Sequence, residues 1–479
     1  MAVNSAYLRQ EPASNHTWIL VALGLLGFAV ASGVALAQGE LDAFFVALAV
    51  IGAMAVMFDF RVGAVLLLCM LPLYDTAVFP HAALGVTGLN PVNLLVLATA
   101  LSYLVHGGRF GDLAPKPLLW LFAVPILLAG LNGIPHIHQI APVFFETNTF
   151  QFTSPFGYMM QFALKPLVIV AIAMLVGVAA ARSQKPESFL VPIMVSLAII
   201  ALIQLGFIIA SGTRLGHLAS SSARTFYNAL GTHANDLGRL FAVAYALLLF
   251  VWWETKDSAL KTALFLTMGL IVLALLLSFS RGAFLGFFVV NALFLLWKFN
   301  SRTLMVALAA AAIFTLLAPD YLWGRITMGF ASGNANEVSA DRVEGIWMPL
   351  LPELFKAPLW GNGLGFTTWS PPMLAGAMNV AGHPHNAYME AVLDMGAIGL
   401  ALLIAFYFHV WKTLRKLGSN PFLSPEMRAL FQGGTAALIC CLITGMSGSS
   451  LRPESEFAYL WVAIGLMYGM RSRKPLTTN

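Results

Sequence analysis

Two histidines flank a proline at His383, Pro384 and His385, immediately before a long and mostly apolar segment. An imidazole titrates near neutral pH, so it can take a proton from a hydroxyl group or, as a cation, bind an anion. Proline is tolerated just before or within the first turn of a helix. The pattern therefore predicts a helix with a reactive histidine at its entrance, and the alternative is that His385 only caps that helix.

Two glycines, Gly396 and Gly399, follow His385 on one predicted helix face. Each residue advances about 100° around a helix, so they lie about 20° and about 40° from His385. Small residues let a neighbouring helix approach closely. We therefore expect a helix to pack at these glycines and to hold His385 at a fixed height, unless the glycines serve packing alone.

Arginine is the second residue type that could carry chemistry. Arg281 follows an apolar run that ends at Leu277, and an arginine at the edge of a membrane span is a functional candidate. Its planar guanidinium can grip two phosphate oxygens at once, whereas the alternative is an anchor at the membrane surface. Arg342 lies in a predicted loop, where arginines are usually solvated, and for Arg224 both readings stay open.

Other charged residues are more typical of structural roles. We expect Glu390 to be buried and hydrogen-bonded rather than catalytic. Orientation or packing is the expectation for Arg214, Arg239 and Arg452.

The composition predicts an all-α polytopic membrane protein. Of 479 residues, 59% are hydrophobic and only 10% charged, with a mean hydropathy of +0.82, whereas a soluble domain carries about a quarter charged residues. Apolar runs are long enough to cross about 30 Å of hydrocarbon, and the alternation typical of outer-membrane barrels is absent. The net charge of +5 is expected to orient the chain in the membrane, and no nucleic-acid partner is expected.

About 14 transmembrane helices are expected. The span near 62–79 contains Pro72 and should be shorter. The predicted spans are 18–36, 42–58, 62–79, 91–105, 117–133, 161–180, 188–210, 234–253, 260–279, 282–298, 302–318, 387–411, 427–446 and 455–470.

Lysine and arginine in the short loops predict the orientation, because they favour the cytoplasmic side. An even number of spans then puts both termini in the cytoplasm. The cytoplasmic loops are those that contain Arg61, Arg109, Lys116, Arg182, Lys185, Lys256, Lys261, Lys298, Arg302, Lys412, Arg415, Lys416 and Arg428.

Four regions follow from this topology. We expect N-terminal transmembrane helices over residues 1–210, central helices with arginine-bearing outer segments over 211–318, a large periplasmic segment over 319–386, and C-terminal helices over 387–479. The periplasmic segment is too long for a turn and contains four tryptophans, so amphipathic helices along the outer interface are expected.

The histidine motif resembles that of bacterial O-antigen ligases. His385 and Asn386, nine further residues and then the run from Gly396 to Gly399 are similar to the ligase pattern H-[N/S/Q]-x9-G-x-x-[G/T/V]. Ser278 to Ala283 (SFSRGA) is similar to an S-x-S-R-G-A segment of the O-antigen ligase and polymerase superfamily. The resemblance covers roughly residues 215–410 and includes Arg224, Arg342 and the stretch from Pro358 to Gly365.

The resemblance implies a function and a fold. It implies a bacterial inner-membrane enzyme with a GT-C-type bundle, a periplasmic cap and an active site facing the periplasm. The implied reaction moves a glycan from undecaprenyl diphosphate to a sugar hydroxyl. His385 would be the base or would bind the donor. The implied site residues are His385, Arg281 and Arg342 as catalytic residues, and Arg224, His383 and Asn386 as substrate-binding residues.

Several alternatives stay open at this stage. The acceptor is lipid A-core if the chain is a ligase, which the histidine motif favours, or a lipid-linked repeat unit if it is a polymerase, which the span count favours. A flippase or secondary transporter is the alternative from another class. No cofactor is expected, although Glu40 and Asp42 form an E-x-D pair that could bind a metal together with His383 and His385.

Overall fold

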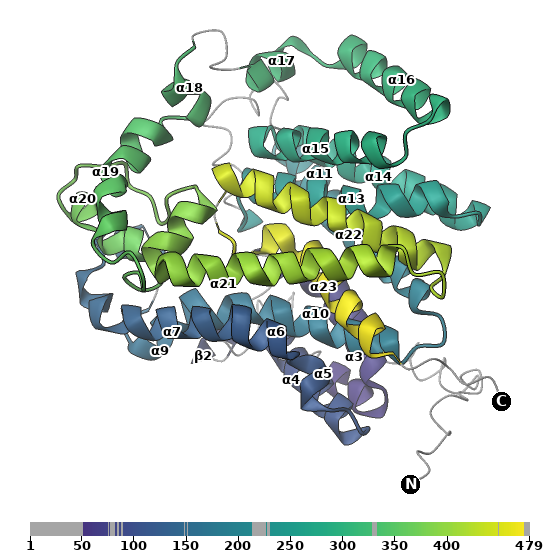
Figure 1. Cartoon of the computed structure of the whole chain (residues 1–479), viewed down its shortest axis with the longest axis horizontal. Helices are drawn as coiled ribbons and strands as arrows, with labels where there is room; N and C mark the ends of the chain where they lie inside the picture. Colours follow the sequence, from purple (N-terminus) through teal and green to yellow (C-terminus); the bar gives the residue numbers. More distant parts are fainter. Residues whose placement is uncertain are drawn as a thin grey trace.

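The structure is a computed structural model and consists of helices that lie side by side in one bundle (Figure 1). Its described residues are 51–74, 76, 82–83, 86–87, 90–147, 149–150, 152–212, 227, 230–327, 333–448 and 450–473. The predicted span 18–36, Glu40, Asp42, Arg214 and Arg224 lie outside these residues, and so does most of the span 42–58.

Helices cover the predicted spans from residue 62 onward, so the all-helical prediction is confirmed. A helix also runs over residues 51–58. The longer α-helices are α3 (Phe60–Met70), α4 (Pro91–Val105), α7 (Val124–Gly133), α10 (Lys165–Ala181), α11 (Leu190–Ala210), α13 (Ala234–Glu254), α14 (Ser258–Leu277), α15 (Arg281–Trp297), α16 (Ser301–Leu317), α21 (Ala387–Gly418), α22 (Pro425–Thr444) and α23 (Ala458–Ser472).

Short elements fill the connections. As the position of Pro72 predicts, α3 ends early and gives way to a 3-10 helix at Leu71–Leu73. The short helices and strands are β1 (Ala82–Ala83), β2 (Val86–Thr87), α5 (Phe110–Leu113), α6 (Lys116–Leu118), α8 (Val143–Glu146), α9 (Pro155–Met159), α17 (Asp320–Thr327), α18 (Ala335–Ser339), α19 (Met348–Leu350) and α20 (Pro371–Leu374). The two strands pair antiparallel.

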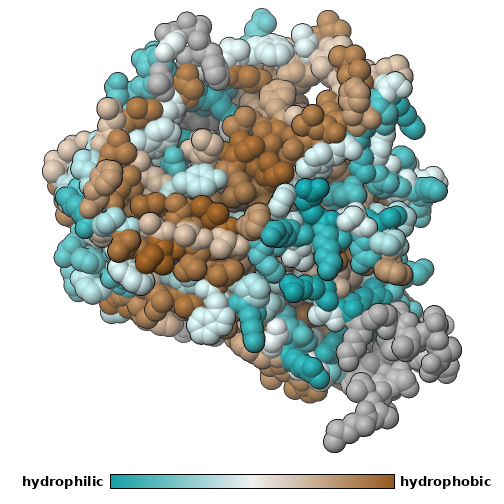
Figure 2. All heavy atoms as spheres, in the orientation of Figure 1, coloured by the Kyte–Doolittle hydropathy of each residue, from teal (hydrophilic) through white to brown (hydrophobic). Residues whose placement is uncertain are grey.

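Seven helices of the described residues are long and apolar enough to cross a membrane, or up to eight if the bent pair at residues 301–327 is one span. The chain is thus a multi-pass membrane protein, and the number fourteen stays a prediction. Three shorter apolar helices cover Phe60–Leu73, Pro91–Val105 and Arg281–Trp297. In Figure 2 hydrophobic residues cover much of the bundle's flank, and hydrophilic residues gather where α21 ends and α22 begins.

The loops rich in lysine and arginine meet at one end of the bundle, here called the basic end. Arg182 Nη1 donates to His106 O at 3.1 Å, and Arg473 Nη2 donates to Ser183 O at 3.2 Å. Lys298 pairs with Glu254 at 2.7 Å, which joins two further loops. The opposite end, where α21 begins, is here called the histidine end. This grouping agrees with the predicted sidedness, although the compartment at each end stays a prediction.

The segment 319–386 forms short helical pieces rather than one long helix. Figure 1 shows α18, α19 and α20 gathered at the histidine end of the bundle. Prolines stand in the first turn of several pieces, such as Pro349 in α19 and Pro372 in α20, where the missing N–H group is tolerated. The described residues of this segment are therefore irregular chain with short helical pieces, and the periplasmic cap stays a prediction.

Three π-helices interrupt the bundle, and each is followed by a proline. They cover Leu119–Ala123, Met160–Leu164 and Val343–Trp347. Because proline has no N–H group, the carbonyl four residues before it loses its helical partner. Two of these carbonyls bind elsewhere: Phe162 O accepts from Arg452 Nη1 at 3.1 Å, and Gly345 O accepts from Asn379 N at 2.8 Å.

Helices α10 and α23 cross at the centre of the bundle through glycines. A Cβ atom added at Gly465 or Gly469 would strike the carbonyl groups of Ala173 and Gly177 in α10. The spacing Gly465-x-x-x-Gly469 is the small-residue pattern that allows close backbone contact in membranes.

Replacing Gly465 with alanine is therefore expected to lower the free energy of unfolding by about 1–3 kcal/mol or more, because the two backbones must separate. Gly269→Ala in α14 is the matched control, since a Cβ there meets nothing within 4 Å. It should be neutral or stabilising by up to about 1 kcal/mol. Thermal unfolding in detergent measures both, and equal midpoints would contradict the close crossing.

Candidate active site

The entrance of α21 is held in an unusual backbone conformation. His385 has a φ of +54°, in the left-handed region that few residues other than glycine adopt. Asn386 then caps the helix, because its side-chain Oδ1 accepts from the backbone N–H groups of Tyr388 and Met389, both at 3.1 Å. His385 is therefore outside the helix, and its expected position on the face of Gly396 is wrong.

The two histidines form a contacting pair. His383 Nδ1 accepts from the backbone N–H of His385 at 3.2 Å, and the ring centroids are 4.1 Å apart. Trp347 Nε1 donates to Pro384 O at 2.7 Å and so fixes the backbone between them. Because His383 Nδ1 accepts this hydrogen bond, the proton of a neutral ring lies on Nε2.

Both imidazoles are neutral at physiological pH. Burial lowers the pKa of His383 to about 3, helped by the positive charges of Arg239, Arg342 and Arg452. Burial also lowers the pKa of His385, and His383, Arg342 and Arg239 lower it further. A neutral imidazole has a lone pair that can accept a proton from a hydroxyl group.

The turn that follows α22 gathers the arginines around the histidine pair. Arg342 Nη1 donates to Ser447 O at 3.0 Å. A Cβ atom at Gly448 would lie 2.6 Å from Arg239 Nη1, and one at Gly282 would lie 3.9 Å from Ser447 Oγ. Arg239 and Arg342 therefore share this turn, and the start of α15 lies against it.

Arg281 is the first residue of α15. Ser280 caps that helix by accepting from Ala283 N at 3.3 Å. The Arg281 side chain is half-buried, and its Nη1 lies 3.5 Å from Glu337 O. A helix N-terminus carries partial positive charge and attracts anions. The guanidinium adds a full charge there, so this corner suits a phosphate group.

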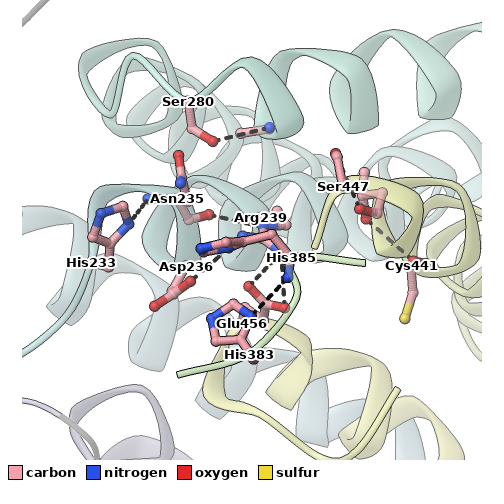
Figure 3. A network of polar contacts seen from close by, with 12 residues as sticks. His233, Asn235, Asp236, Arg239, Ser280, His383, His385, Cys441, Ser447 and Glu456 are labelled. Atoms are coloured by element: carbon pink, nitrogen blue, oxygen red, sulfur yellow. Dashed lines mark hydrogen bonds and ion pairs between the residues drawn. The ribbon is translucent and has the colours of Figure 1, made fainter. Parts of the chain in front are cut away.

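Two buried ion pairs support the site. Arg239 Nη1 lies 3.0 Å from Glu456 Oε2, and its Nη2 lies 3.7 Å from Asp236 Oδ1. Arg452 Nη2 pairs with Glu390 at 2.8 Å, which confirms that Glu390 is buried and hydrogen-bonded. Figure 3 shows Arg239 between Asp236 and the two histidines, with Glu456 close by.

The helix α21 breaks at Gly396, where φ is +68° and ψ is −176°. The loop from Pro358 to Gly365 fits into this break: Ala397 N donates to Pro358 O at 2.8 Å, and Gly363 N donates to Asp394 O at 3.0 Å. Asp394 also accepts from Gly365 N and Phe366 N at 3.0 and 3.1 Å. The segment that packs at Gly396 is therefore a loop. The prediction that a neighbouring helix packs there is wrong.

Comparison with known proteins adds a family. Residues 263–404 match the model of the O-antigen ligase family. The match confirms the resemblance to the O-antigen ligase and polymerase superfamily and points to a glycosyltransferase-type membrane enzyme. No curated protein matches the chain. The matched residues, here called the ligase segment, contain Arg281, Arg342, His383, His385 and Asn386.

The structure brings most of the predicted site residues together. His383, His385 and Arg342 meet beside the turn after α22, and Arg281 begins α15 at the same turn. Asn386 uses its side-chain Oδ1 to cap α21. Arg224 lies outside the described residues.

Sequence reasoning missed several residues beside the histidines. Arg239, expected to be a packing or orientation residue, lies next to the pair, and Glu456 and Ser447 lie outside the ligase segment altogether. A sequence signal exists for Ser447 alone: the run from Gly445 to Ser455 is polar and rich in glycine and serine between two apolar helices.

The pKa directions predict a particular pH profile. A histidine with its ordinary pKa of about 6.5 would lose activity as the pH falls through that value. Here both pKa values are lowered, so the imidazoles stay neutral on acidification, and kcat/KM should stay level from about pH 8 to about pH 5. A fall in kcat/KM centred near pH 6.5 would show that His385 is not in the environment described.

Proposed function

We propose that the chain transfers a glycan from undecaprenyl diphosphate to a sugar hydroxyl on the periplasmic side of the bacterial inner membrane. We further propose that it is an O-antigen ligase with lipid A-core as acceptor. The observation that carries the proposal is the histidine pair at the entrance of α21, with Arg342 bound to the turn after α22, within a segment that matches the ligase family.

His385 acts on the acceptor hydroxyl in this reaction, and Arg281 and Arg342 act on the leaving diphosphate. The acceptor hydroxyl attacks the anomeric carbon of the glycan, and the bond from that carbon to the diphosphate oxygen breaks. His385 takes the proton of the hydroxyl, which raises its nucleophilicity. Undecaprenyl diphosphate leaves with the bonding electron pair, and Arg281 and Arg342 bind its anionic oxygens.

The supporting geometry is that of a rigid site. Trp347 and the His383 ring hold the backbone of His385, while Asn386 starts the helix behind it. Groups that are already in place do not have to reorient during the reaction. Electrostatic catalysis is effective for this reason. The substrate-binding roles of His383, Asn386 and Arg224 remain part of this proposal.

Deleting the gene tests the proposal. Loss of a ligase leaves long, finished polymer on undecaprenyl diphosphate and none on lipid A-core. Loss of a polymerase leaves single repeat units, on the carrier or already transferred. Single units alone would therefore replace the ligase assignment with the polymerase alternative, while the donor and the site residues would stay the same.

The transporter alternative makes a different structural prediction. Transporters place ionisable groups near the middle of the membrane. Here Glu390 lies in the first turn of α21 and Arg239 in the second turn of α13, and their partners Arg452 and Glu456 lie in or next to the turn between α22 and α23. These pairs thus stand at the histidine end, which favours chemistry at a surface.

Replacing Arg281 with lysine is expected to lower transfer about 10- to 100-fold. Lysine keeps the charge but loses the planar fork that donates two parallel hydrogen bonds, and a hydrogen bond to a charged group contributes about 1.5–3 kcal/mol. Arg302→Lys at the basic end is the matched control and should transfer normally. Initial rates of transfer with purified protein measure both variants. An unchanged rate for Arg281→Lys would contradict bidentate binding of a phosphate group by Arg281.

A further inference from the structure

A polar cavity opens beside the histidine pair without containing it. Its volume is about 710 Å³, and it lies between the start of α10, the start of α13 and the turn before α23. Its charged and amide-bearing walls are formed by Gln161, Lys165, His233, Asp236, Arg452 and Glu454. The reaction steps described above use none of these side chains.

The walls of the cavity are fixed in place. Gln161 lies in the π-helix Met160–Leu164, and Lys165 follows it directly. Phe162 O, released by Pro166, accepts from the buried Arg452, whose other nitrogen pairs with Glu390. A π-helix changes the direction of the residues after it and is frequent at functional sites.

The cavity connects to the histidines through Arg239. Asp236 of the cavity wall lies 3.7 Å from Arg239 Nη2, and the same guanidinium pairs with Glu456. Figure 3 shows His233 and Asp236 on one side of Arg239 and His385 on the other. The charge of His233 acts on the pKa of His385, so the two are electrostatically close.

The charges of the cavity exclude a diphosphate as its natural ligand. Lys165 and Arg452 are balanced by Asp236 and Glu454, so the walls offer no excess of positive charge. Mixed donors and acceptors instead suit hydroxyl groups, which both donate and accept hydrogen bonds. The corner at Arg281, with its helix N-terminus, is the better place for phosphate.

We propose that this cavity binds an electrically neutral sugar of the acceptor and presents its hydroxyl group to His385 past Arg239. The inference rests on the proposed glycan transfer and adds the subsite and the chemical class of the acceptor. Gln161 and Lys165 are then residues that determine acceptor specificity.

A thiol at the mouth of the cavity tests the proposal. Thr149 lines the cavity and is exposed, so Thr149→Cys is expected to fold and to react with a methanethiosulfonate reagent. Ala377→Cys, exposed elsewhere at the histidine end, is the matched control. Wild-type protein treated with the same reagent accounts for Cys69, Cys440 and Cys441.

Two readouts separate the acceptor from the donor. A bulky adduct on Thr149→Cys should lower transfer at least 10-fold, while undecaprenyl diphosphate still raises the melting temperature by the wild-type amount. The adduct on Ala377→Cys should change neither. Undiminished transfer by modified Thr149→Cys would overturn the proposal, and so would loss of stabilisation by undecaprenyl diphosphate, because the cavity would then hold the donor.

Saccharide binding can also be measured without glycan transfer, so that this inference is tested separately from the proposed function. A neutral, lipid-free oligosaccharide should slow the modification of Thr149→Cys but not of Ala377→Cys. Failure of the wild-type protein to transfer any glycan would contradict the proposed function. Protection of the Thr149→Cys thiol by the oligosaccharide would still support a saccharide site. No protection, or protection only by phosphorylated sugars, would overturn the neutral-saccharide assignment.

Gln161→Ala should also raise KM at least about 5-fold for the acceptor and leave KM for the donor unchanged.

Discussion

Glycan transfer should fall about 10²- to 10⁴-fold when His385 is replaced by alanine, the range expected for loss of a general base. His385→Asn is the sharper variant. Asparagine tolerates the left-handed conformation that His385 adopts at φ +54°, so the backbone before α21 should be retained. Neither side chain can accept the hydroxyl proton at neutral pH. Initial transfer rates with purified protein and lipid-linked donor measure the effect.

A second histidine at the same end provides the control. His138 is exposed in the 3-10 helix Ile134–Gln139, and His138→Ala should transfer at the wild-type rate. Near-normal transfer by His385→Asn, with an unchanged melting temperature, would remove His385 from its assigned role.

Replacing Gly396 with alanine is expected to unfold or strongly destabilise the protein. Gly396 has φ +68° and ψ −176°, a combination that is essentially confined to glycine and costs about 1–3 kcal/mol for other residues. The added Cβ would also strike the carbonyl of Leu359 in the docked loop. The two effects should together cost about 3 kcal/mol or more, because neither backbone can retreat without losing its hydrogen bonds.

The expected result is a large drop in melting temperature and in the amount of folded protein after purification. Gly206→Ala in α11 is the control, because its Cβ would meet nothing within 4 Å. A melting temperature of Gly396→Ala equal to that of Gly206→Ala would mean that α21 is continuous and the loop is not docked there.

The glycine pair marks where sequence reasoning succeeds and where it stops. The spacing after His385 predicts the resemblance to the O-antigen ligase family that residues 263–404 match, because that pattern is local. It does not show that Gly396 breaks the helix, since a glycine in an apolar run is read equally well as a packing contact. The partner loop lies more than thirty residues upstream of Gly396, and only the folded chain brings Pro358 beside Ala397.

The helices themselves were predictable because hydrophobicity over a long run is a strong signal. Loops such as those at Arg182 and Lys298 also meet at one end, as their charge predicts. The ion pair between Arg239 and Glu456 was not predictable, because 217 positions separate its partners. A single charged residue in an apolar segment gives no information about its partner, so the sequence predicts only a packing or orientation role for Arg239.

The most direct test of the account is the fate of the donor in a reconstituted membrane. Purified protein in nanodiscs receives the undecaprenyl-diphosphate-linked glycan with and without the acceptor, and the release of undecaprenyl diphosphate is measured. Release of undecaprenyl diphosphate should depend on the acceptor, should equal the amount of glycosylated product, and should be lost in His385→Asn. Donor that stays intact in the presence of acceptor would contradict the assignment of this chain as a glycosyltransferase.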